Sequence, residues 1–267
     1  MAHPSCLIIG GTGFVGSTIA KAAVERGWNV TAIGRETYER VKGWQFDFVI
    51  NANGNASRFR ANQDPQFDFE ASVLSVYRSL FDFRYDVYGL ISTVDVYNEP
   101  SCEESTAEDT WIDTETLAPY GMHKRLAELL VMQHCPRWHV FRLAQMVGDG
   151  LKKGPIYDLL HRKPLWITAD SRLHYMNTQN VARVVLNVME CQAASNIYNV
   201  CGRGNVEFRQ VIELLAAGPS SVAPSPGERQ TYRIQTNKIE QLYAMPDSWD
   251  EVSTFVDHAL RGTDQVG

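Results

Sequence analysis

Seven residues near the amino terminus, GGTGFVG at positions 10–16, most constrain what this chain can fold into. The apolar run Cys6–Ile9 before them indicates a buried strand, and the apolar residues that follow recur on one face of a helix. In that context, glycines permit a tight turn, and the N-terminus of the helix offers free N–H groups to a phosphate. We therefore expect the pyrophosphate of a dinucleotide to be bound by Gly10, Gly11, Thr12, Gly13, Phe14, Val15 and Gly16. The alternative is an ordinary strand-turn-helix corner.

The composition of the chain limits which kinds of partner it is expected to bind. Its 267 residues carry 25 basic and 31 acidic side chains, a net charge of −6, and no long basic run, so neither nucleic acid nor an anionic membrane is expected as a partner. No apolar run is long enough to span a bilayer. The five cysteines are widely spaced without a Cys-x-x-Cys pair, and no signal-peptide pattern is present, which favours free thiols in the cytoplasm. His134, Cys135 and His139 match no metal-site spacing, so no metal is expected.

Apolar runs alternate with helical patterns along the first half of the chain. The runs at 5–10, 29–34, 46–52, 87–93 and 138–143 are typical of buried strands, and the alternation predicts an α/β fold with a doubly wound parallel sheet. Residues 35–45 leave room for only a short helix, and residues 58–65 indicate a loop. Residues 67–84 predict a helix whose apolar stripe belongs to the core: Phe69, Val73, Val76, Tyr77, Leu80 and Phe81.

The pattern changes after Val147, where glycines and a proline interrupt the chain. We expect a Rossmann-like dinucleotide-binding domain over residues 1–147 with parts of 175–201. A small C-terminal substrate-binding lobe is expected over residues 148–174 and 202–250. Within that lobe, the composition of residues 219–227 indicates a surface loop.

Two polar groups of the sequence are suited to acid-base chemistry. Tyr120 and Lys124 are four residues apart at the start of a helical pattern, so they share one helix face, where the ammonium would favour the phenolate. Thr93 ends the predicted strand 87–93, at the edge of a parallel sheet where ligands bind, whereas Ser92 should point to the opposite face and pack there. The alternative for Tyr120 and Lys124 is a surface pair on an amphipathic helix.

Taken together, these motifs resemble the extended short-chain dehydrogenase/reductase superfamily, specifically its NAD-dependent epimerase/dehydratase family, which modifies sugar nucleotides. The resemblance rests on the segments GGTGFVG (10–16), NANG (51–54), ISTVDVY (91–97), YGMHK (120–124) and Arg142 with Val147-Gly148. It implies that Tyr120 is the catalytic acid/base and that Thr93 bonds the reacting oxygen. It also implies that Lys124 binds the nicotinamide ribose and tunes Tyr120, and that the cofactor is further contacted by Asn51, Ala52 and Asn53.

The resemblance also suggests substrate contacts. Asp95 stands where dehydratases of the family carry a glutamate, but Val94 replaces the acid expected before it, which argues against dehydration. Gln145 matches an asparagine that meets the substrate pyrophosphate. Arg172 is one residue out of register with a phosphate-binding arginine. Lys152, beside Lys153 in a glycine-flanked loop, is either a phosphate contact or merely solvated.

Arg35, at the end of the second predicted strand, bears on the choice of cofactor. A guanidinium at this position suits a 2′-phosphate and favours NADP over NAD. The alternative is that Arg35 stacks on adenine or is solvated while Glu36 takes the ribose, as NAD would require.

The expected activity is 4-keto reduction or epimerisation of a nucleoside-diphosphate sugar through a keto intermediate. One alternative is reduction of a smaller, non-nucleotide carbonyl compound. Another is a non-catalytic, NADP-binding redox sensor, since fold alone does not establish activity. The resemblance further suggests a homodimer formed through the helices at 67–84 and 119–134.

Overall fold

A six-stranded parallel sheet organises the larger part of the protein, a computed structural model of which describes residues 3–216 and 227–263. The strands are β1 (Ser5–Ile9), β2 (Asn29–Ile33), β3 (Gln45–Asn51), β4 (Arg84–Thr93), β5 (Trp138–Leu143) and β9 (Asn196–Val200). Their order is β2-β1-β3-β4-β5-β9, and every neighbouring pair is parallel. The strand order reverses between β1 and β3, and ligands of doubly wound sheets bind outside the carboxyl ends of the strands at such a point.

The chain divides into two compact units. The first unit comprises residues 1–98, 108–143 and 179–200, and the second comprises residues 99–107, 144–178 and 201–267. Most of the expected loop at 219–227 lies outside the described residues. No helix in the described ranges is long and apolar enough to cross a membrane. All five cysteines, each of them described, are free.

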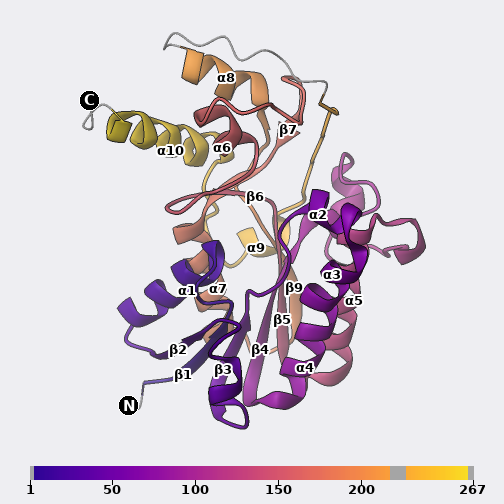
Figure 1. Cartoon of the computed structure of the whole chain (residues 1–267), viewed down its shortest axis with the longest axis vertical. Coiled ribbons are helices and arrows are strands. Elements are labelled where there is room, and N and C mark those ends of the chain that lie inside the picture. Colours follow the sequence, from indigo (N-terminus) through magenta and orange to yellow (C-terminus); the bar gives the residue numbers. More distant parts are fainter. Residues whose placement is uncertain (1–2, 217–226, 264–267) are drawn as a thin grey trace. The chain divides into compact units, whose positions relative to one another are not determined.

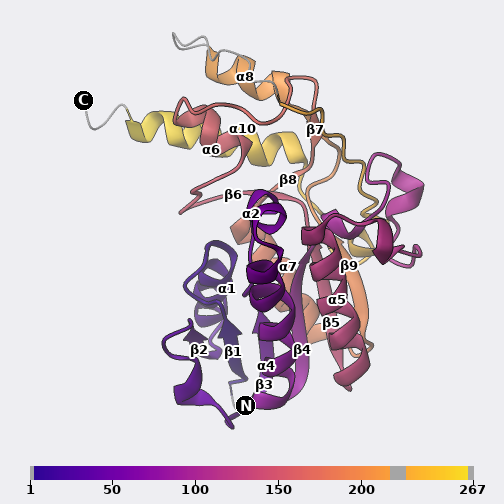
Figure 2. The ribbon, with the colours of Figure 1, turned by 45° about the vertical axis from the view of Figure 1, so that its right-hand side comes forward.

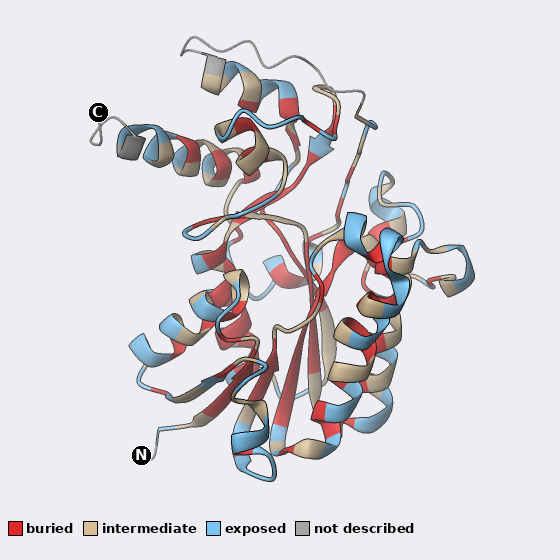
Figure 3. Cartoon of the chain, in the orientation of Figure 1, coloured by how far each residue is buried: buried red, intermediate tan, exposed pale blue. Residues whose placement is uncertain are grey.

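In the first unit, helices cover both faces of the sheet. Helices α1 (Phe14–Glu25) and α7 (Thr178–Cys191) lie on one face, and α4 (Ser75–Asp82) and α5 (Pro119–His134) lie on the other (Figures 1 and 2). The central strands are therefore largely buried and the edge strand β2 much less so, whereas the outward faces of the helices are exposed (Figure 3). This double cover explains why the strands read as continuous apolar runs. The connection between β2 and β3 holds only a 3₁₀ turn, η1 (Tyr38–Val41), in the place where a short helix was expected.

The region between β3 and β4 differs from the sequence-based expectation. Residues 58–65, expected to form a loop, contain the helix α2 (Arg58–Gln63). The expected helix at 67–84 consists of α3 (Pro65–Phe69), a π-helical turn η2 (Glu70–Leu74) and α4. Its apolar stripe is only half in the core. Val73, Val76 and Leu80 are buried, but Phe69, Tyr77 and Phe81 are 36%, 37% and 62% exposed.

The second unit contains short strands and helices. Its strands are β6 (Gln145–Val147), β7 (Arg172–Leu173), β8 (Tyr175–Asn177) and β10 (Val206–Glu207), in the pairs β6-β8 (parallel) and β7-β10 (antiparallel). Its helices are α6 (Pro155–Leu160), α8 (Phe208–Ala216), α9 (Asn237–Glu240) and α10 (Ser248–Thr263), and α10 packs against β8. Residues 99–107 join this unit through Thr106, whose hydroxyl donates to the Arg233 carbonyl at 2.9 Å.

The remaining short helical turns are η3 (Val94–Val96), η4 (Glu103–Thr106) and η5 (Thr114–Thr116). The first of these follows β4 directly and begins with Thr93 as its N-cap residue. The carboxyl end of β4 thus turns at once into a hydrogen-bonded loop, which fixes the position of Thr93.

Candidate active site

The glycine-rich turn joins β1 to α1 at the carboxyl edge of the sheet. Gly10 has a φ of +78°, and the N–H groups of Gly10 and Gly11 donate to the Ile33 carbonyl at 2.9 and 3.0 Å, which ties the turn to β2. A Cβ on Gly16 would lie 2.2 Å from the Gly10 oxygen, so α1 packs directly on the turn. Because Gly13 is the N-cap residue and has no side chain, no side-chain oxygen of the cap accepts from the first N–H groups of α1. This arrangement is suited to binding a pyrophosphate.

A cavity of about 380 Å³ in the first unit lies beside this turn. Three residues expected to contact a cofactor line it: Gly10, Arg35 and Asn53. Glu70 and Arg78, from the region between β3 and β4, line it as well. The sequence analysis did not single out these two residues, because only their place on the helix brings them to the cavity. The position of the cavity, next to the ends of β1 and β2, suits the adenosine half of a dinucleotide.

The segment after β3 approaches the glycine turn through its backbone. A Cβ on Gly10 would lie 2.9 Å from the carbonyl carbon and oxygen of Ala52 and from the nitrogen of Asn53. Asn51 is fully buried, and its side-chain amide donates to the Tyr88 hydroxyl at 2.8 Å. The turn and this segment therefore form the two sides of the crevice at the carboxyl ends of β1 and β3.

Tyr120, Lys124 and Thr93 come together where α5 begins and β4 ends. All three are buried, at 9%, 9% and 7% exposure. The Thr93 hydroxyl donates to Asp95 Oδ2 at 3.3 Å and accepts from the Asp95 N–H at 3.2 Å. Lys124 Nζ lies 3.0 Å from the point that a Cβ on Gly54 would occupy, so the amine rests on the segment after β3. The helix face predicted to carry Tyr120 and Lys124 is thus directed inward rather than toward solvent.

Burial and neighbouring charges set the pKa of the Tyr120 phenol. Burial raises this pKa above its usual value, and the carboxylates of Asp95 and Asp68 raise it further. The Arg58 guanidinium and the hydrogen bond with Thr93 lower it. Without a bound cation the phenol is therefore protonated and able to donate.

Arg58 is a member of this cluster that the sequence analysis missed. It lies on α2, and its Nη1 is 3.4 Å from Asp95 Oδ1. The signal was present at both ends of the region expected to be a loop. Ser57 caps α2 by accepting from the Arg60 N–H, and Asp64 caps α3 just before Pro65, which is the usual chemistry of helix starts.

A buried ion pair fixes α5 against the sheet. Arg142 on β5 donates to both carboxylate oxygens of Glu128 on α5, through Nε at 3.0 Å and Nη2 at 2.8 Å. The Ser92 hydroxyl donates to Glu128 Oε1 at 2.6 Å, so Ser92 packs inside while Thr93 stands at the site. Burial alone would raise the pKa of Glu128, but Arg142, Ser92 and Arg125 outweigh burial and hold this pKa below its usual value.

The residues expected to contact substrate are divided between the units. Asp95 belongs to the first unit, beside Tyr120, and Gln145, Lys152 and Arg172 belong to the second. Arg172 lines a cavity of about 650 Å³ within the second unit, together with Arg229 and Arg233. Gln145 and Lys152 are not among the residues that line it.

Acidic groups lie at the second-unit cavity and beside one of its arginines. Glu99 lines it, and Arg172 Nη2 lies 3.3 Å from Glu207 Oε2. Within residues 3–216 and 227–263, no group of three or more His, Cys, Asp or Glu side chains is placed to hold a metal ion.

The chain is similar to known proteins in sequence pattern and in fold. The model of the NAD dependent epimerase/dehydratase family matches residues 6–201. No curated protein sequence matches the chain. Similar solved structures include MoeE5 in complex with UDP-glucuronic acid and NAD, with 15% identity over 97% of this chain and 99% of that chain and a TM-score of 0.81.

Two further structures bound to different cofactors are similar as well. UDP-glucuronic acid 4-epimerase from Bacillus cereus, in complex with UDP-glucuronic acid and NAD, is 16% identical over 96% and 99% of the two chains, with a TM-score of 0.79. The dTDP-4-dehydrorhamnose reductase of Bacillus anthracis, in complex with NADP, is 13% identical over 97% and 99%, with a TM-score of 0.78. At these identities the likeness shows the fold, which is the expected doubly wound, Rossmann-like one.

Proposed function

This chain belongs to the NAD dependent epimerase/dehydratase family, and from that premise we propose that it is an NAD(P)-dependent oxidoreductase acting on a nucleoside-diphosphate sugar. The reaction is reduction of a 4-keto group, or epimerisation of a carbon through a keto intermediate. The observation that carries the proposal is the buried cluster of Tyr120, Thr93 and Lys124 in the unit that contains the glycine turn.

In this proposal Tyr120 is the acid/base of the reaction. Its protonated phenol donates to the carbonyl oxygen of the sugar during reduction and takes the proton back during oxidation. The Thr93 hydroxyl bonds the same oxygen and stabilises the charge that develops on it. A bound nicotinamide supplies the hydride chemistry. Lys124, one helical turn from Tyr120, binds the adjoining ribose and favours the phenolate when oxidation requires it.

We propose NADP as the preferred cofactor and NAD as the alternative. Arg35 lines the cavity beside the glycine turn, and Arg78 from α4 adds a second guanidinium to its lining. Guanidinium groups bind phosphate with two parallel hydrogen bonds, which suits the 2′-phosphate of NADP. Glu39 and Glu70 line the same cavity and supply acceptors for ribose hydroxyls, as NAD would use. Dissociation constants for NADPH and NADH decide between the two cofactors.

A nucleotide sugar is proposed as substrate because the second unit contains a cavity with three arginines. Arg172, Arg229 and Arg233 line it, and a diphosphate matches their charge. Gln145 and Lys152, in the same unit, are proposed as further contacts with the substrate. UDP-sugars are the ligands named for two of the similar structures, and they are the first compounds to test here.

The decisive experiment begins with the purified protein. Denaturation that releases tightly held NAD favours an epimerase, whereas an empty site that takes up NADPH favours a reductase. Turnover is then measured with UDP-glucose, UDP-glucuronic acid, a dTDP-4-keto sugar and a small ketone. Tyr120→Phe should lower kcat at least about a hundredfold while leaving dinucleotide affinity within about twofold, because it removes only the proton donor.

Other outcomes support other functions. Turnover of the small ketone alone supports a reductase of non-nucleotide carbonyl compounds. Dinucleotide binding without turnover of any substrate supports a redox sensor. Undiminished kcat in Tyr120→Phe refutes the assigned role of the phenol.

A homodimer in a reducing compartment such as the cytoplasm completes the proposal. Tyr77 and Phe81 on α4 and Leu129 on α5 are large apolar side chains exposed on the two helices expected to form the interface. Exposed apolar side chains on neighbouring elements suit an interface between subunits. Light scattering of the purified protein measures the oligomeric state.

A further inference from the structure

Three asparagines alternate from the last residue of β3 onward, at positions 51, 53 and 55, and their side chains all contact the helical region made of α3, η2 and α4. We call this set of contacts the asparagine ladder. Its bonds are Asn51 Nδ2 to Ser79 Oγ (3.2 Å), Asn53 Nδ2 to Ser75 Oγ (3.1 Å), Asn55 N–H to Ser72 Oγ (3.3 Å) and Asn55 Nδ2 to Asp68 Oδ1 (2.9 Å). The ladder fixes this segment to the helices through its odd-numbered residues.

The even-numbered residues of the segment approach different groups. Ala52 approaches the glycine turn so closely that a Cβ on Gly10 would lie 2.9 Å from its carbonyl oxygen. Gly54, with a φ of +134°, has Lys124 Nζ 3.0 Å from the position of its missing Cβ. The asparagines of the segment are therefore held by the helices, and its small residues bring its backbone close to the turn, the amine and Ser72.

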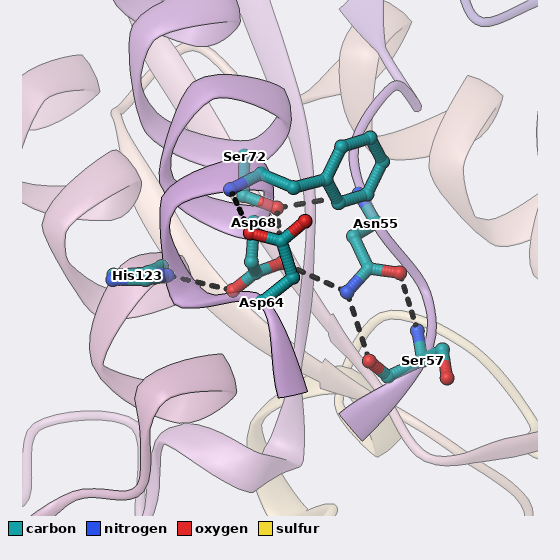
Figure 4. A network of polar contacts seen from close by, with 7 residues as sticks. Asn55, Ser57, Asp64, Asp68, Ser72 and His123 are labelled. Carbon is teal, nitrogen blue, oxygen red and sulfur yellow. Dashed lines mark hydrogen bonds and ion pairs between the residues drawn. The ribbon is translucent and has the colours of Figure 1, made fainter. Parts of the chain in front are cut away.

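Asp68 connects the last rung of the ladder to α5. Its carboxylate is fully buried and accepts from Asn55 Nδ2 and from Ser72 Oγ at 3.2 Å, while its other oxygen lies 2.6 Å from Nδ1 of His123. Figure 4 shows Asp68 between His123 on one side and Asn55 on the other. A carboxylate that lost these partners would be costly to bury, so the bonds hold the three elements together.

His123 is placed so that this connection affects the site. It is 4% exposed and precedes Lys124 on α5, one turn after Tyr120. The ring of Phe69 meets the His123 ring edge-on, with centroids 5.4 Å apart, and limits its freedom to turn. Any change in the bond between His123 and Asp68 therefore alters how α5 meets the segment on which the Lys124 amine rests.

We propose that Asp68 and His123 are positioning residues that hold Lys124 against the segment 51–55, where its ammonium meets the ribose next to the nicotinamide. The inference rests on the proposed function, since it assumes that a dinucleotide binds at the glycine turn. Asp68 and His123 act through Lys124, and the part of the ligand that they influence is the nicotinamide end alone.

The test compares ligands that contain or lack the nicotinamide end. Using the full chain, the dissociation constant of NADPH is compared with that of 2′,5′-ADP, and the dissociation constant of NADH with that of ADP. His123→Leu should weaken the preferred dinucleotide about tenfold, or about 1.4 kcal/mol, and change the affinity for the matching ADP less than twofold. His123→Asn should restore the dinucleotide affinity, because its amide nitrogen stands near the position of Nδ1.

Two further variants make the result specific. Tyr85 lies at the start of β4, and its hydroxyl donates a partly buried hydrogen bond to the Leu80 carbonyl. Tyr85→Phe removes this bond but none of the contacts of Asp68 or His123, so its ligand affinities should match those of the wild type. Asp68→Asn keeps an acceptor but loses the charge, and it should weaken the dinucleotide selectively, by less than His123→Leu does. Asp68→Asn decides the question should His123→Leu fail to fold.

Three results would overturn the proposal. One is a dinucleotide affinity that is unchanged in His123→Leu or, where that variant does not fold, in Asp68→Asn. Another is an equal loss of dinucleotide and ADP affinity, which would indicate a general structural role. The third is a wild type that binds neither NADPH nor NADH, in which case the proposed function fails as well. The first two leave the proposed function intact.

Discussion

Replacing Gly121 with alanine tests how closely α5 must approach the loop after β4. A Cβ on Gly121 would lie 2.3 Å from the carbonyl oxygen of Asp95, and real Cβ atoms essentially never come within 3.0 Å of such an atom. The alanine therefore displaces α5 from η3 by about 0.7 Å. The atom it meets is backbone, so no side-chain rotation relieves the contact.

The displacement has opposite effects on helix stability and on the site. Alanine contributes up to about 1 kcal/mol of helix propensity over glycine. Overpacking costs about 1–3 kcal/mol, so a net loss of up to about 2 kcal/mol is expected. Since a misplacement of about 1 Å can lower a rate about a hundredfold, and Tyr120 and Thr93 lie on the two displaced elements, kcat should fall by about tenfold to a hundredfold.

The assay combines thermal unfolding, followed by circular dichroism, with turnover of whichever of the candidate substrates the wild type accepts. Gln133→Ala is the control, because Gln133 is on the same helix but is exposed and should change both measurements little. A Gly121→Ala protein with a higher Tm and unchanged kcat would refute the reasoning, because it would mean that α5 and η3 accommodate a methyl group between them.

Two further predictions concern charge. Arg58→Gln should move the pH dependence of the oxidation rate to higher pH, because Arg58 lowers the pKa of Tyr120. The control Arg60→Gln, on the same helix, should leave that pH dependence unchanged. A pH profile of Arg58→Gln equal to that of the wild type would contradict the prediction. Burial lowers the pKa of His139 from 6.5 to about 4. Between these pH values the unfolded chain binds more protons than the folded one. The free energy of unfolding should therefore fall by up to about 3 kcal/mol as the pH falls from 6.5 to 4. Denaturant unfolding should show that fall in the wild type and a smaller one in His139→Phe.

The sheet and the glycine turn could be predicted from the sequence because their signals are local. The runs at 5–10, 29–34, 46–52, 87–93 and 138–143 correspond, in that order, to β1, β2, β3, β4 and β5 within a few residues at each end. Strands β1, β4 and β5 are buried along most of their length, so they appear in the sequence as largely apolar runs, whereas the edge strand β2 is mostly exposed or half-buried. Tyr120 and Lys124 could be paired for a similar reason, since a helix places residues four apart on one face whatever surrounds it.

The helical region made of α3, η2 and α4 could not be predicted in the same way, because its buried side is partly polar. Asp68, Ser72, Ser75 and Ser79 recur at helical spacing and face the asparagines of the segment 51–55. A periodicity argument assigns such a polar row to solvent and assigns the aromatic residues of the same helix to the core. The structure has the reverse for Phe81, which is 62% exposed, and for Ser79, which is fully buried. Partners on elements far away in the sequence, namely these asparagines, His123 and Tyr88, make a polar interior favourable.

The site is assembled largely by backbones that approach each other where no side chain intervenes. Gly16 brings α1 onto the carbonyl of Gly10, Gly10 admits the peptide of Ala52, and Gly121 brings α5 onto the carbonyl of Asp95. Each contact lies at the carboxyl edge of the sheet, and each fixes a distance between two elements that carry proposed site residues. A side chain at any of these contacts would widen the site, because the neighbouring atom is backbone and cannot turn away. The spacing between the glycine turn, the segment 51–55 and α5 is thus set by three glycines, and the proposed roles of Tyr120, Thr93 and Lys124 depend on that spacing.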